Sequence, residues 1–179
     1  MKKKRKGEIG IVVPMFFITF MVIMIAYLLQ LTGYGAIRTM TEDALAMSNL
    51  ASAVIDIEAY GKTHDILIAD PEQAFETYKR ALQANMKLDA QWTGQDTQYG
   101  KVEILDYIVY NVSGSDVEIF RFGQSPESRF VAGGLGSVEA PNGQRIEKTG
   151  IYSRVTFPVN GLFGIVTTAV KDKLVDVTN

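Results

Sequence analysis

Few residues in this chain have types and spacings that could do chemistry. His64 is the only histidine and lies in the polar stretch YGKTHD, without the partner ligands that a zinc site needs. Ser113, Ser125 and Ser153 do not stand in a nucleophile-elbow sequence, and the glycine cluster AGGLG lacks the following Lys-Ser or Lys-Thr of a phosphate-binding loop. We therefore name no catalytic residue, metal ligand or cofactor, and expect a protein that is not an enzyme.

The acidic side chains give two different readings. Glu42 with Asp43, and Asp56 with Glu58, are adjacent or nearly adjacent carboxylates, which we interpret as the solvated face of a helix. Glu8 differs, because it stands between five consecutive basic residues and a long apolar run. A carboxylate at a membrane edge costs little in the headgroup zone, but deeper in the membrane it needs a positive partner.

The apolar run predicts a membrane-spanning helix over residues 9–32. These 24 residues carry no formal charge, whereas a bilayer core needs ~20 helical residues. A secretory signal peptide is the alternative, and Gly33-Tyr34-Gly35 weakly fits its small-x-small cleavage rule, but its apolar region is typically ~7–15 residues. Pro14 lies early in the span, where a mild kink is tolerated.

Charge is distributed unevenly along the chain. The net charge is −2, yet residues 2–6 are all basic, while residues 38–179 hold 13 basic and 19 acidic side chains. The basic cytoplasmic leader, residues 1–8, orients the amino terminus to the cytoplasm and the remainder outside the cell membrane. An acidic body argues against a nucleic-acid partner, and the absence of cysteine excludes disulfides.

The helical pattern continues beyond the span, through residues 33–61. Its apolar stripe comprises Ile37, Met40, Ala44, Met47, Ala51 and Val54, widened by Leu50 and Ile57. Gly33 and Gly35 are candidate bend positions, and Gly61 is the expected helix end. The stripe either packs against the protein's own outer domain or packs, in part, against other subunits.

Residues 62–179 predict an extracytoplasmic α+β domain. Asp70 and Pro71 signal the start of a second helix. The apolar face of that helix is formed by Phe75, Tyr78, Leu82 and Met86. Beyond it we expect five to six antiparallel strands, with the helix on one face of the sheet.

The strand predictions rest on β-branched and aromatic runs separated by turn residues. Strands are expected at 101–112 and 116–122 around Ser113-Gly114-Ser115, in a short hairpin around Asn142-Gly143, and on either side of the turn at 159–161. Residues 123–135 are polar and glycine-rich, so we expect a loop there.

The order of these features resembles the type IV pilin-like proteins. Within that group the chain is most similar to the TadE-like pseudopilins of the tight-adherence (Tad) pilus systems of Gram-positive bacteria. The specific likeness is GEIGIVVP, in which Glu8 stands six residues before Pro14. It covers the first 55 residues well and the sheet only by type.

The resemblance implies a membrane-held minor pilin or pseudopilin that contributes to assembly of a pilus or secretion apparatus, with roles in adhesion and secretion. Its partners would be other pilin-like subunits, a membrane assembly platform and a prepilin peptidase. Glu8 and Pro14 would be assembly residues, with Glu8 pairing with a neighbour's amino terminus.

Gly7 would be the peptidase site, but here it touches Glu8, whereas in that family the glycine stands several residues earlier. Two outcomes stay open: cleavage after Gly7, or a retained leader whose Lys or Arg meets the Glu8 of an adjacent subunit. The alternative function is a single-pass protein with an extracytoplasmic ligand- or partner-binding domain and the long helix as its stalk.

Overall fold

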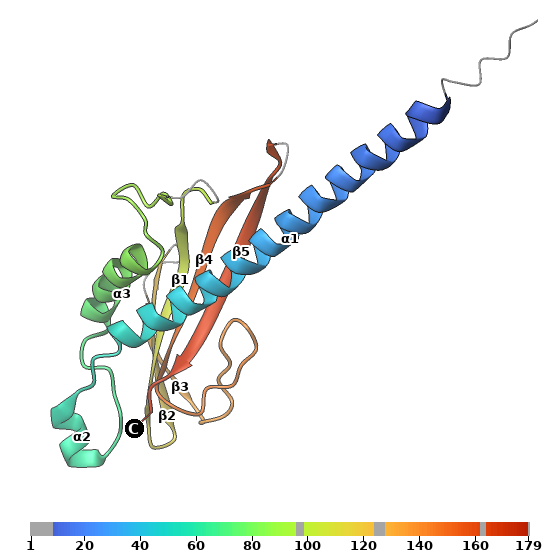
Figure 1. The fold of residues 1–179 in the computed structure, drawn as a ribbon. Coiled ribbons are helices and arrows are strands. Elements are labelled where there is room, and N and C mark those ends of the chain that lie inside the picture. The colour runs from blue at the N-terminus through green and yellow to red at the C-terminus, as the bar shows by residue number, and fades with distance from the viewer. Residues whose placement is uncertain (1–8, 96–98, 124–127, 162–163, 179) are drawn as a thin grey trace, which may run out of the picture. The chain divides into compact units, whose positions relative to one another are not determined.

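The computed structural model describes residues 9–95, 99–123, 128–161 and 164–178 (Figure 1). The chain divides into two units, Met1–Ile37 and Arg38–Asn179, and helix α1 (Ile9–Ser52) contributes to both. In the first unit the helix continues through Pro14, and its backbone is also helical at the predicted bend positions Gly33 and Gly35. The long N-terminal helix is therefore confirmed.

Helix α1 ends at Ser52, nine residues before the predicted end at Gly61. Residues 53–56 leave the helix, and a short helix α2 (Ile57–Thr63) follows. The break has a local cause, because Asp56 takes an extended backbone and its Oδ1 accepts a hydrogen bond from the Ala59 N–H at 2.9 Å. Asp56 is thus an N-cap, which starts a new helix and interrupts the old one.

Helix α3 (Pro71–Asn85) forms where the sequence predicts it. The Asp70 carboxylate accepts the N–H of Gln73 at 2.9 Å, and Pro71 occupies the first turn. Three residues of the predicted apolar face, Tyr78, Leu82 and Met86, are fully buried.

Five antiparallel strands form one sheet in the order β3-β2-β1-β4-β5. The strands are β1 (Glu103–Ser113), β2 (Asp116–Gly123), β3 (Ser128–Gly133), β4 (Gly150–Asn160) and β5 (Val166–Asp176). The β1–β2 hairpin turns at Gly114, whose φ of +58° suits glycine. The predicted α+β arrangement is confirmed at this level.

Two local predictions in the sheet are wrong. Residues 128–133 form strand β3 inside the predicted loop, because Phe130 and Val131 lie in register with β2 despite the flanking glycines. The Asn142-Gly143 turn forms, with Gly143 at φ +80°, but its flanks make only one isolated bridge, between Glu139 and Arg145. This segment is therefore a tight turn without strands.

The sheet buries side chains on both faces. On one face Tyr107 of β1 meets the rings of Tyr78 and Phe75 from α3, with centroids 4.7 and 5.2 Å apart. The other face is covered by the segment between β3 and β4. Its apolar cluster comprises Ile108, Tyr110, Val117, Ile119, Ala140, Ile146 and Tyr152.

Candidate functional site

Within the second unit, α1 docks on its own domain through small and polar side chains. The buried face comprises Thr41, Ala44, Leu45, Ser48, Asn49 and Ser52, spaced three and four residues apart. Leu45 is the only large apolar residue among them. Of the predicted apolar stripe, Ala44 lies on this buried face, whereas Met40, Met47, Leu50, Val54 and Ile57 are exposed.

Hydrogen bonds fix this polar face on the sheet. The Asn49 side-chain amide donates to the carbonyl oxygens of Ile151, at 3.3 Å, and Lys173, at 3.0 Å, on the two neighbouring strands β4 and β5. The Ser52 hydroxyl lies 2.9 Å from the Tyr107 hydroxyl. Burial raises the pKa of Tyr107, so this phenol stays neutral at physiological pH.

An ion pair joins the same helix to the edge of the sheet. Glu42 Oε1 lies 2.8 Å from the Lys171 ammonium on β5 and 3.1 Å from Arg38 Nε, one helical turn away. The hydrogen bond from Lys171, followed by that from Arg38, lowers the pKa of the Glu42 carboxyl. Glu42 is partly exposed, so we expect this contact to position the helix more than to stabilise the fold.

The opposite side of α1 carries large apolar side chains that the described chain leaves uncovered. Met40, Met47 and Leu50 lie on this side of α1, and the exposed Val54 and Ile57 follow after the helix ends at Ser52; we call these five residues the apolar strip. Met47 is 62% exposed and Ile57 82% exposed. Because Met40 and Met47 are seven residues apart in one helix, they lie on the same side of it.

An apolar pocket follows the strip, where α1 gives way to α2. Its volume is about 390 Å³, and its lining is Ala53, Val54, Ile55, Ile57, Tyr60 and Ile66. The backbone around it is held by hydrogen bonds from Asp56 N–H to Leu67 O, at 2.8 Å, and from Ala69 N–H to Val54 O, at 3.1 Å. Sequence reasoning placed Val54 and Ile57 in a continuous helix, so it missed the pocket that the break creates.

The first unit has the properties of a membrane span. Over its described residues, α1 is the one helix of the chain long and apolar enough to cross a membrane, and none of its most apolar 18-residue window is buried. Its polar side chains bond within the helix: Thr19 to the Met15 carbonyl, Thr32 to the Leu28 carbonyl, and Gln30 to the Tyr34 hydroxyl. Internal bonding of this kind is what a span without water requires.

Of the three residues expected to act in assembly or processing, the structure describes only Pro14. Pro14 lies inside α1 with its side chain exposed. Gly7 and Glu8 lie outside the described residues, so their roles stay predictions.

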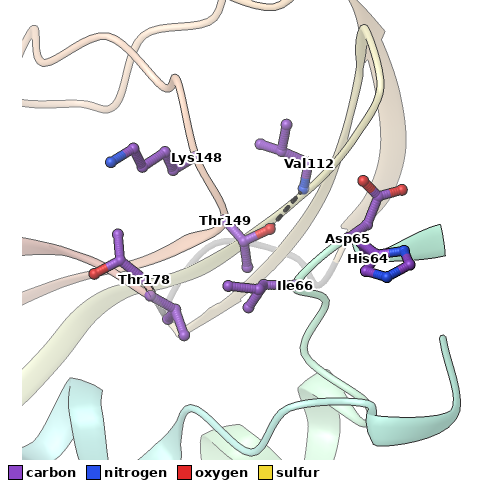
Figure 2. Close-up of a pocket in the computed structure, with 8 residues that line it drawn as sticks. His64, Asp65, Ile66, Val112, Lys148, Thr149 and Thr178 are labelled. Carbon is purple, nitrogen blue, oxygen red and sulfur yellow. Dashed lines mark hydrogen bonds between the residues drawn. The ribbon is translucent and has the colours of Figure 1, made fainter. Parts of the chain in front are cut away.

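Of the polar residues considered for chemistry, His64 lies beside the pocket drawn in Figure 2. His64 ends α2 in a left-handed conformation, with φ of +62°, and lines a pocket of about 350 Å³ together with Asp65, Lys148 and Thr149. Asp65 Oδ2 accepts a hydrogen bond from Ser113 at 2.8 Å, and Thr149 Oγ1 accepts one from the Val112 N–H at 2.9 Å. These two hydrogen bonds each join separate segments of the chain and so contribute to the fold.

Two further points concern catalytic and metal sites. Ser153 is fully buried, and Ser125 lies outside the described residues. Over the part of the chain that the structure describes, no three His, Cys, Asp or Glu residues are grouped as metal ligands would be.

Comparison with known proteins finds no matching family model, curated protein or solved structure. The class that the structure defines is accordingly broad. It is an α+β protein with one N-terminal helix long and apolar enough to serve as a membrane anchor.

Replacing Asn49 by alanine removes its two hydrogen bonds to the carbonyl oxygens of the sheet. We expect the free energy of unfolding to fall by about 1–3 kcal/mol, since each of the two net hydrogen bonds contributes ~0.5–1.5 kcal/mol. Urea unfolding of the detergent-solubilised protein, followed by the fluorescence of Trp92, measures this change. The control is Met47→Ala, on the exposed side of the same helix, which should stay within about 0.5 kcal/mol of the wild type. If the free energy of unfolding falls equally in Asn49→Ala and Met47→Ala, then Asn49 does not fix the helix on the sheet.

Replacing Glu42 by glutamine should lower stability at neutral pH by less than ~1 kcal/mol, because the ion pair is partly exposed. A carboxyl whose folded pKa is lowered stabilises the fold above its unfolded pKa and loses that effect as the pH falls. The difference between wild type and Glu42→Gln should therefore shrink as the pH drops below 4.5 and disappear in more acidic solution. Unfolding curves across this range test it, with Asp43→Asn as the neighbouring control. A difference that persists unchanged in acid contradicts the assignment.

Proposed function

We propose that this chain is a membrane-anchored minor pilin or pseudopilin that contributes to assembly of a Tad or type IV-like pilus or secretion apparatus. One observation carries the proposal. Helix α1 is apolar and exposed in its first part, and in its second part Met40, Met47 and Leu50 are exposed, while Leu45 is the one large apolar residue that faces the domain. A simple stalk or anchor does not need that second feature.

A membrane location of the first unit is supported by composition and by internal hydrogen bonding. Residues 9–37 carry no formal charge, and Thr19, Gln30 and Thr32 have partners within the helix. The basic leader then places the amino terminus in the cytoplasm and the α+β domain outside. The N-terminal helix is embedded in membrane lipid before assembly.

The apolar strip supports a partner outside the membrane. Met47 and Leu50 follow Thr32, the last residue of the predicted span, by 15 and 18 residues, and they belong to the second unit. Lipid does not cover side chains so far from the end of the span. Full burial of one such side chain contributes ~1.5–3 kcal/mol, so another apolar helix on the strip is favoured. We expect the partners that bind the apolar strip to be other pilin-like subunits and a membrane assembly platform.

The residues near the amino terminus complete the proposal through the family resemblance. Glu8 pairs with a positive group of a neighbouring subunit, and Pro14 sets the local helix geometry. Gly7 is the site at which a prepilin peptidase acts if the leader is removed.

The alternative function is a single-pass protein whose outer domain binds a ligand or partner. The polar pocket beside His64, with Asp65 and Lys148 in its lining, is the observation that favours it. Under this alternative α1 is only a stalk, and its apolar strip needs no partner.

Photo-crosslinking separates the two functions. A benzophenone amino acid at Met24 or at Met47, introduced in the native host, should capture other subunits that carry an apolar N-terminal helix, identified by mass spectrometry. The same probe at Arg80, on an exposed part of α3, is the control and should capture much less. Only monomer at both Met24 and Met47 contradicts the pilin-like proposal and favours the binding domain.

A further inference from the structure

The hairpin of β4 and β5 carries an exposed apolar patch in a stretch without charge (Figure 1). Residues 155–170 contain no Asp, Glu, Lys or Arg. Within this stretch the side chains of Ile165, Val166 and Val170 are 62%, 58% and 45% exposed. We call these three residues the hairpin patch. Neighbouring apolar side chains left in water on a domain surface indicate a place where something binds.

The paired backbone of the hairpin holds the patch outward. β4 and β5 remain in register as far as Asn160 and Val166, and the Gly161 N–H donates to the Ile165 carbonyl at 2.7 Å. At the other side of β4, Tyr99 forms an isolated bridge with the end of that strand. Ile165 is therefore exposed because the local fold keeps it there, and the surface is formed before any partner arrives.

The patch lies on the side of the second unit at which α1 enters. Toward its N-terminal end, α1 bonds first to Lys173 and then to Lys171, so it follows β5 toward the beginning of that strand. Arg38, the first residue of the unit, lies one helical turn further in this direction. Val166 precedes Lys171 by five residues, which is ~16 Å at ~3.3 Å per residue of strand. The hairpin thus extends toward the entry of α1.

This side of the unit stays close to the membrane by chain length alone. The predicted span ends at Thr32, and the second unit begins six residues later, at Arg38. Six residues reach at most ~22 Å in any conformation, however the two units are arranged. With the span in lipid, the outer leaflet is the apolar surface within reach of the hairpin. We propose that the hairpin patch binds the outer surface of the lipid membrane.

The chemistry of the hairpin fits the headgroup zone and not the hydrocarbon core. β5 is the last strand of the sheet that the structure describes, so one edge of its backbone is left without a partner strand. Such an edge does not enter hydrocarbon, but at the interface water and headgroups can bond to it. Thr167 and Thr168 are exposed beside the patch and add hydroxyl groups for the same zone. The apolar side chains therefore reach only the boundary between headgroups and acyl chains.

The inference rests on the membrane anchor of the proposed function and adds a second contact with lipid, which that function does not require. The second contact fixes the outer domain against the membrane while α1 spans it. Transfer of the chain out of the membrane breaks both contacts and exposes the hairpin patch.

Fluorescence of a single cysteine tests the inference, because the natural chain has none. The full-length Ile165→Cys protein is labelled with nitrobenzoxadiazole and placed in vesicles of phosphatidylcholine and phosphatidylglycerol. We expect blue-shifted emission that lipids with a nitroxide near the headgroup quench more strongly than lipids with a nitroxide deep in the acyl chain. The matched control is Ser115→Cys, in the β1–β2 turn at the opposite end of the sheet, whose label should emit as in water. Equal emission and quenching at Ile165 and Ser115 overturns the inference.

A label at Met24→Cys separates the failure of this inference from the failure of the proposed function. If deep nitroxides quench the Met24 label while the Ile165 label stays in water, the inference is overturned and the membrane anchor stands. If neither label is quenched, the anchor and the inference are both wrong.

Two further measurements exclude other causes of a signal at Ile165. Dilution of the protein in lipid should leave the quenching unchanged; a signal that disappears on dilution shows that a second copy covers the patch and overturns the inference. In a copy with Val166→Ser and Val170→Ser, quenching at Ile165 should weaken while quenching at Met24 persists. Undiminished quenching at Ile165 shows that the label itself enters the lipid and also overturns the inference.

Discussion

The hydrogen bonds from Asn49 to the carbonyl oxygens of Ile151 and Lys173 decide which side of α1 faces the sheet. Asn49 Oδ1 is already buried without a partner, so rotation of α1 about its axis would leave the amide nitrogen unpaired as well. Once Asn49 and Ser52 face inward, Met40 and Met47 face outward by helical geometry alone. The exposed apolar strip is thus a consequence of the polar face, and the proposed interactions depend on it.

Much of the fold could be predicted from local signals in the sequence. Asp70 and Pro71 mark the start of α3 because capping and a fixed φ act within one turn. Four of the five strands follow from runs of β-branched and aromatic residues. Strand β3 was missed because its glycines and polar flanks indicate a loop, and only pairing with β2 makes it a strand.

The candidate site was harder to predict than the fold. The stripe of Met40, Met47 and Val54 has the spacing of a buried face, and hydrophobicity alone assigns it to the core. The small and polar residues Thr41, Ser48 and Ser52 repeat at helical spacing as well, and that pattern was the available signal. Which face of the helix is buried depends on how the helix packs against the sheet, and this tertiary contact cannot be read from the local sequence.

Chemical labelling of Met47→Cys tests most directly the claim that the strip is a contact surface, because the natural chain has no cysteine. The account predicts fast maleimide labelling of the solubilised, separated protein and slow labelling in intact cells with the assembly present. An Arg80→Cys variant, exposed on α3, gives the reference rate in both states. If Met47→Cys reacts as fast as Arg80→Cys in intact cells, no partner covers the strip and the central claim is wrong.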